Sequence, residues 1–172
     1  MLRILTSCLL VLSLASCNDA LTDQGRVYEA LFKQLATLDR KYYIREKLAD
    51  PYQHRDLLGD ISQLAEYDFP ALSPTHSVDE FASVDVQLIS QAEFDKMFTD
   101  GCKHGWARFH RQYPEAKALL GMSRVGFSSS RTEAAVYIET GAGCLAGQGN
   151  IVYLSKRWFR WKVVNTEHLW IS

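Results

Sequence analysis

Two cysteines in the second half of the chain, Cys102 and Cys144, have the widest choice of chemistry. In an oxidising compartment an even pair favours a disulfide, which here would close a loop of about forty residues. As a free thiol, Cys144 could instead act as a nucleophile if His104 or His110 took up its proton. Both alternatives stay open, because the sequence does not give the distances between these side chains.

Ser123 is a second candidate nucleophile, of the kind that a small hydrolase uses with a histidine base. It lies within Gly121–Gly126, where glycines stand on both sides of it. The spacing has one residue more than the nucleophile elbow of serine hydrolases, and the segment lacks the strand–turn–helix context of that elbow. We therefore predict that Ser123 belongs to a strand. A small hydrolase or thiol enzyme using Cys144 or Ser123 with a histidine is the alternative function.

No cofactor or metal site is predicted. Gly141–Ala146 formally fits a dinucleotide fingerprint, but that motif must open a helix inside a parallel βαβ unit. Here it joins two predicted antiparallel strands, which favours a hairpin loop. His104 and His110 are six positions apart, on different sides of a helix, and no cysteine or carboxylate completes a metal-ligand spacing. His168 is predicted to be a surface or hydrogen-bonded residue.

The N-terminus has the layout of a secretory signal peptide. One positive charge at Arg3 precedes an apolar run from Ile4 to Leu14, which is too short to span a membrane. The run ends in Leu14–Cys17 (LASC), which resembles the lipobox of bacterial lipoproteins. In that family the cysteine sulfur is diacylated, the peptide is cut just before it, and the new N-terminus usually receives a further acyl chain such as palmitate. The resemblance implies a signal peptide at residues 1–16 and a lipid on Cys17.

The mature protein is then expected to be residues 17–172, a single domain preceded by a polar tether at residues 17–24. Loss of Arg3 takes the formal charge from −1 to −2, and a near-neutral chain without a basic cluster argues against nucleic-acid binding. The acyl chains predict attachment to a membrane through lipid, on the periplasmic side of the cell envelope. Asn18 after the lipidated cysteine resembles an outer-membrane sorting signal, if the host is Gram-negative.

About three helices are predicted. The first begins near Asp23 and repeats apolar residues at helical spacing. The second begins at Asp50–Pro51, with a capping acid and a proline in the first turn. The third begins with the capping box Ser90–Glu93, ends at Tyr113–Pro114 and is expected to be the main core helix. Its apolar stripe is Phe94, Met97, Phe98, Cys102, Trp106 and Phe109.

The other predicted elements are strands. Residues 42–48 and 84–88 each fit a single strand, and the last fifty residues fit an antiparallel run. The strands of this run are expected at residues 123–127, 132–140, 150–156, 161–165 and 169–172. The predicted class is therefore α+β: an antiparallel sheet of four to five strands covered by about three helices.

Several short motifs in the C-terminal half form a recognisable pattern. They are Ser123–Phe127 (SRVGF), Ala135–Tyr137, Gly147–Gly149, Trp161–Val163 and Trp170–Ser172 (WIS). Together they resemble an uncharacterised bacterial lipoprotein-type family, closely after Phe94 and loosely before it. The resemblance implies a fold and no activity. That family tends to have a polar turn resembling Asn-Gly where this chain has Arg157–Arg160.

Arg157–Arg160 (RWFR) is the most unusual stretch of the chain. At a hairpin tip, Trp158 and Phe159 would lie near solvent between Arg157 and Arg160, and aromatic and arginine side chains anchor interfaces. The alternative is that the two rings pack over the edge of the sheet. We expect a lipid-anchored envelope protein that binds another protein or an envelope component without catalysis. An adaptor within a larger envelope complex is a further alternative.

Overall fold

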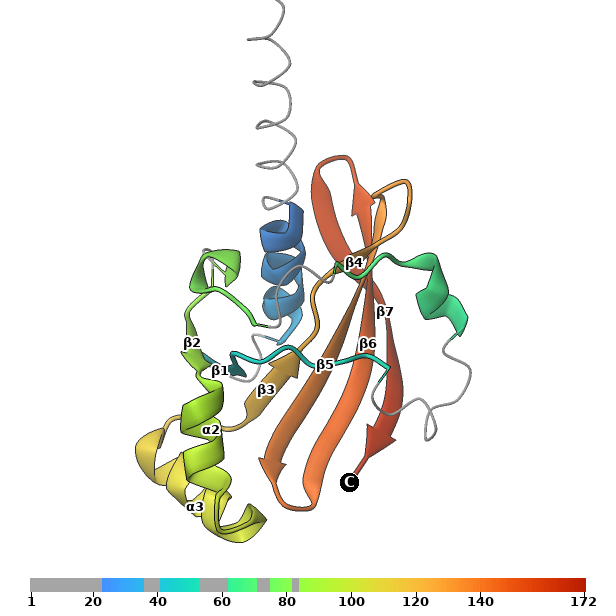
Figure 1. Ribbon diagram of the computed structural model, residues 1–172. Helices are drawn as coiled ribbons and strands as arrows, with labels where there is room; N and C mark the ends of the chain where they lie inside the picture. Colours follow the sequence, from blue (N-terminus) through green and yellow to red (C-terminus); the bar gives the residue numbers. More distant parts are fainter. Residues whose placement is uncertain (1–22, 36–40, 53–61, 71–74, 82–83) are drawn as a thin grey trace, which may run out of the picture.

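The computed structural model describes residues 23–35, 41–52, 62–70, 75–81 and 84–172. The predictions on Cys17 and on the signal peptide lie outside these residues, as does most of the helix predicted from Asp50. Within the described residues the chain forms three α-helical segments and one mixed sheet (Figure 1). The α+β class predicted from the sequence is confirmed.

Seven strands make up the sheet. They are β1 (Tyr42–Arg45), β2 (Val86–Ile89), β3 (Leu119–Met122), β4 (Gly126–Phe127), β5 (Glu133–Gly143), β6 (Ala146–Arg157) and β7 (Arg160–Ile171). Their order in the sheet is β2-β1-β3-β5-β6-β7, and β4 pairs with β5. The described sheet therefore has more strands than the four to five predicted.

The sheet is also not purely antiparallel, so that part of the prediction is wrong. β1 pairs in parallel with β2 on one side and with β3 on the other, whereas the strands from β3 onward pair in antiparallel fashion. Parallel neighbours need long connections that cross over the sheet. Here about forty residues separate β1 from β2, and two helices lie between β2 and β3. Such pairing is set by tertiary structure and leaves no local signal in a short strand.

β7 is one long strand where the sequence predicted two, at residues 161–165 and 169–172. Its pairing with β6 shifts register twice, between Tyr153 and Leu154 and again between Gly149 and Asn150. Each shift leaves one residue of β7 without a partner, which is the geometry of a β-bulge. A bulge interrupts the alternation of apolar and polar residues, so one strand resembles two in the sequence.

The predicted main core helix is two helices, α2 (Gln91–Phe98) and α3 (Cys102–Gln112). Ser90 caps α2 as predicted, because its Oγ accepts a hydrogen bond of 3.2 Å from the Glu93 N–H. The single helix is a correction: the chain turns at Gly101, whose φ of 85° lies in the left-handed region that interrupts an α-helix. The break lets the two helices pack against each other.

The core lies on both faces of the sheet. On one face the helical segment at residues 23–35 packs Val27 and Leu31 against the sheet, as the helical spacing predicted, and these side chains share a buried cluster with Ile138 and Val152. On the other face, side chains such as Tyr137 pack with the 3₁₀-helix η1 (Ser62–Glu66). α2 and α3 pack their own apolar cluster against β1 and β3.

Candidate functional site

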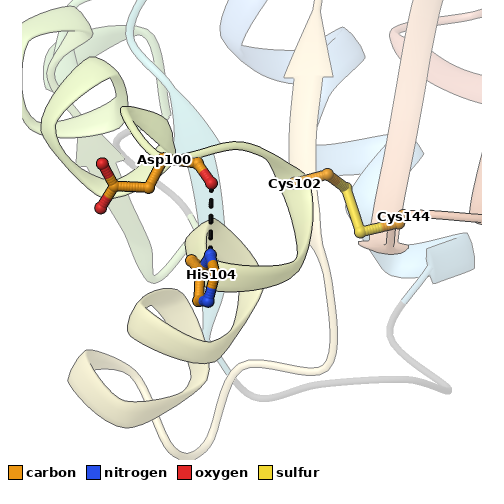
Figure 2. The surroundings of a disulfide bond; sticks show 4 residues. All are labelled: Asp100, Cys102, His104 and Cys144. Carbon is orange, nitrogen blue, oxygen red and sulfur yellow. Dashed lines mark hydrogen bonds between the residues drawn. A yellow bond between two sulfur atoms is a disulfide. The ribbon is translucent and has the colours of Figure 1, made fainter.

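Cys102 and Cys144 form a disulfide, with their Cα atoms 5.6 Å apart (Figure 2). The bond joins the start of α3 to the turn between β5 and β6. In this disulfide the Cys144 sulfur is bonded to Cys102, so it is not the free thiolate that a thiol enzyme needs as its nucleophile. His104 lies on the side of α3 away from the disulfide in Figure 2, and its Nδ1 is 3.2 Å from the Asp100 carbonyl oxygen. The geometry therefore gives no support to Cys144 as a nucleophile.

Ser123 follows β3 and lies outside the strands, contrary to the predicted strand at residues 123–127. It is 2% exposed. Its Oγ donates to the Arg124 carbonyl oxygen at 2.7 Å and accepts from the Tyr137 N–H at 2.9 Å. Both bonds hold the backbone where the chain leaves β3. The side chain thus has a structural role and does not face a cleft.

Gly141–Ala146 forms the end of an antiparallel hairpin, as its position between two predicted strands indicated. Gly141 pairs with Gly147, and Gly143 pairs with Ala146. Leu145 at this turn is 86% exposed. Within the described residues no group of three or more histidine, cysteine or acidic side chains is arranged to hold a metal ion.

A cavity with a volume of about 210 Å³ lies between the helical segment at residues 23–35 and the sheet. Its walls are mostly apolar, and a few polar side chains line part of them. Its lining consists of Leu31, Gln34, Leu35, Lys41, Tyr42, Tyr43, Ala118, Leu120, Ile138, Thr140, Gln148, Asn150, Val152, Val163, Thr166 and His168. A concave, largely apolar site with a few polar groups is the usual form of a small-molecule site.

A bulge in β7 sets which side chains reach this cavity. Asn150 pairs with His168, whereas the adjacent Gly149 pairs with Trp170, so Leu169 is the extra residue. In a regular strand His168 and Trp170 would share a face. The bulge instead lets His168 line the cavity, while Trp170 donates from Nε1 to the Tyr137 hydroxyl, at 2.9 Å, on the opposite face. The bulge therefore brings an imidazole next to Asn150.

Asn150 is the polar group that distinguishes this cavity. It is 7% exposed, and its Oδ1 has no hydrogen-bond partner among the described residues. A buried amide oxygen without a partner destabilises a fold by about 1–3 kcal/mol, so such atoms are rare in proteins. Its strand neighbour across β5 is the apolar Ile138. Asn150 thus places a buried acceptor without a partner among the described residues between the apolar Ile138 and the imidazole of His168.

A second polar cluster is centred on Glu80, whose two carboxylate oxygens are both paired, and has a structural role. Glu80, in the 3₁₀-helix η2 (Val78–Phe81), accepts hydrogen bonds from His76 at 2.9 Å, Arg124 at 2.5 Å and Gln24 at 3.1 Å. The cluster joins η2 to the N-terminal helical segment and to the chain after β3. Burial alone would raise the pKa of Glu80, but the hydrogen bonds from His76 and the Ser77 N–H, with the charges of His76 and Arg124, outweigh it and lower the pKa below its usual 4.5.

Arg157–Arg160 forms the tip of the β6–β7 hairpin. Arg157 pairs with Arg160, so Trp158 and Phe159 are the two loop residues. Their side chains are 93% and 81% exposed, so the alternative that the two rings pack over the edge of the sheet is wrong. Trp158 has a φ of 60°, a conformation that glycine adopts freely and that costs other residues about 1–2 kcal/mol. Neither packing nor backbone preference explains a tryptophan at this position.

Sequence reasoning did not identify the cavity. It placed Asn150 in a strand and predicted that His168 is a surface or hydrogen-bonded residue; His168 is indeed exposed, and it also lines the cavity. The cavity is formed by segments that are far apart in the chain. One local signal was present: Asn150 directly precedes the apolar run Ile151–Leu154, and a buried asparagine at such a position is unusual. His168 could not be assigned to the same wall, because the bulge at Leu169 is not visible in the sequence.

Comparisons with known protein families, with curated proteins and with solved structures find no match. The class of this protein is therefore described from its own structure: it is an α+β domain with a largely apolar cavity between a helix and a mixed sheet. None of the helices in the described part of the chain is long and apolar enough to cross a membrane.

Proposed function

We propose that this chain is a non-catalytic, lipid-anchored binding domain of the bacterial cell envelope, and that it binds a small apolar ligand in the cavity under residues 23–35. The observation that carries the proposal is the buried Oδ1 of Asn150, which has no partner among the described residues and belongs to a lining residue of the cavity. A ligand that donates a hydrogen bond to this atom would remove the cost of burying it. The lipid anchor rests on the lipobox at Leu14–Cys17.

The size and lining of the cavity indicate the class of ligand. A cavity of about 210 Å³ is larger than the roughly 150 Å³ that holds benzene in an engineered protein, and smaller than most drug-binding sites. Ile138 and Val152 favour an apolar body, and Asn150 favours a single hydrogen-bond donor on it. The ligand class is therefore a small aromatic or aliphatic molecule with one N–H or O–H group.

Indole and 1-methylindole form a matched pair of probes for this site, because only indole has an N–H donor. Calorimetric titration of the folded protein is expected to show tighter binding of indole. Asn150→Leu should weaken indole binding by about tenfold, the effect of one net hydrogen bond of about 1.4 kcal/mol, and leave 1-methylindole unaffected.

Asn165→Leu provides the control, because Asn165 lies exposed on β7 and does not line the cavity. It should leave the binding of both probes unchanged. The proposal fails if neither probe binds the wild-type protein, or if Asn150→Leu binds both probes as the wild type does.

A further inference from the structure

The exposed hairpin tip lies at the same end of the molecule as the start of the described N-terminal helix. Lys156, next to the tip, donates from Nζ to both carboxylate oxygens of Asp23 at 2.9 Å. Asp23 is the first described residue of the helical segment at residues 23–35. In Figure 1 the β6–β7 hairpin rises beside the beginning of this blue helix, whereas the β5–β6 turn lies at the opposite end.

This position places the tip within reach of the predicted lipid. Cys17 precedes Asp23 by six residues, and six residues span at most about 20 Å. Trp158 follows Lys156 by two residues, or about 7 Å along a strand. A membrane that holds acyl chains on Cys17 is therefore close to the tip.

The side chains at this end suit a membrane surface. Tryptophan is enriched at the level of the lipid headgroups, where its ring is partly buried and its N–H stays near water. Exposed basic residues attract anionic lipids. The basic residues at this end include Arg157 and Arg160 at the tip, Lys162, Arg131, and Lys156 and Arg26, which both pair with Asp23; the acidic residues include Glu133, and Glu66 and Asp68, which line a groove with Arg131. At the tip itself, the exposed Arg157 and Arg160 flank the two exposed rings.

We propose that Trp158 and Phe159 insert into the headgroup region of the membrane that carries the Cys17 lipid, with Arg157 and Arg160 at its anionic headgroups. The inference rests on the lipid anchor of the proposed function. Two contacts, the lipid and the tip, fix the orientation of the domain, whereas one flexible anchor would let it rotate. The exposure of both rings and the backbone conformation of Trp158, which neither packing nor propensity explains, then have a role.

The test uses the lipidated protein purified from membranes and reconstituted in vesicles of phosphatidylethanolamine and phosphatidylglycerol. Brominated acyl chains quench the fluorescence of tryptophans that lie in the membrane. We expect quenching in the wild type and its loss in Trp158→Phe, because Trp161 is buried and Trp106 and Trp170 pack against other elements. Leu145→Ser is the matched control: this side chain is 86% exposed at the opposite hairpin, and its loss should not change quenching.

The outcomes separate this inference from the anchor on which it rests. A protein with acyl mass on Cys17 but no quenching of Trp158 overturns the membrane position and keeps the anchor. Quenching that persists in Trp158→Phe would likewise overturn the membrane position of the tip and leave the anchor intact. A protein without acyl mass overturns the anchor and, with it, the membrane position of the tip.

Discussion

Asn150 lowers the stability of the fold, and the same side chain has the proposed binding role. Its amide oxygen is one of three buried side-chain atoms without a partner among the described residues, and each such atom needs an explanation. Leucine has the same branching, with two larger methyl groups in place of the amide oxygen and nitrogen, and does not need a hydrogen bond. The wall of the cavity near Ile138 and Val152 is apolar enough to accept it.

We predict that Asn150→Leu raises the free energy of unfolding by about 1 kcal/mol while it weakens indole binding, because the cost of the unpaired oxygen is removed. Urea denaturation of the ligand-free protein measures the change. A fall in stability would show that the oxygen is satisfied in the native protein, and would remove the observation on which the ligand class depends.

Glu80 is the opposite case, a buried carboxylate with every oxygen paired. Its pKa is lowered in the folded protein, so its contribution to stability is present above the unfolded value near 4.5 and is lost as the pH falls through the folded value. We predict that Glu80→Gln lowers the free energy of unfolding by about 3 kcal/mol at neutral pH, since His76 and Arg124 lose their counter-charge. The variant should also lose part of the stability difference between neutral and acidic pH.

Urea denaturation at neutral pH and below pH 4.5 checks this prediction. Glu115→Gln, at an exposed position after α3, is the control and should match the wild type at both pH values. Equal stability of Glu80→Gln and the wild type at neutral pH would mean that the carboxylate does not hold η2 to the sheet.

At the level of elements, the sequence predicted what depends on local periodicity. The helical spacing of Val27 and Leu31, the Ser90 cap and an antiparallel run at the C-terminus are present, although the two strands predicted at residues 161–165 and 169–172 are one strand, β7. The parallel pairing of β1 was not predictable, because it depends on segments about forty residues apart. The candidate site was missed for the same reason, and because a bulge at Leu169 turns His168 towards the cavity.

The disulfide is the covalent link between two elements that otherwise share few contacts, α3 and the β5–β6 hairpin. It closes a loop with a sequence separation of 42 residues. We predict that Cys102→Ser combined with Cys144→Ser lowers the free energy of unfolding by about 4 kcal/mol, mainly because the unfolded chain gains entropy.

Urea denaturation of this double variant and of the reduced wild type should give matching values, and circular dichroism should show that the secondary structure is retained. Equal stability of the oxidised wild type and the double variant would contradict a stabilising role for the bond. Pocket binding of indole should survive in the double variant, because neither cysteine lines the cavity.

At the scale of the whole molecule, the cavity and the hairpin tip have different positions and different proposed roles. The cavity lies between the helical segment at residues 23–35 and the middle of the sheet, whereas the tip extends from the end of β6 and β7. In the proposed arrangement the lipid and the tip hold the domain on the membrane. The cavity then has a fixed orientation relative to the membrane surface.

The most direct test of a lipid-anchored binding domain is the mass of the protein purified from membranes, recorded first under native and then under denaturing conditions. We predict a chain that begins at Cys17, carries acyl mass, and has a small molecule bound that is released on denaturation. A chain that keeps residues 1–16 or lacks acyl mass would contradict the anchor. Identical native and denatured masses would contradict the occupied cavity.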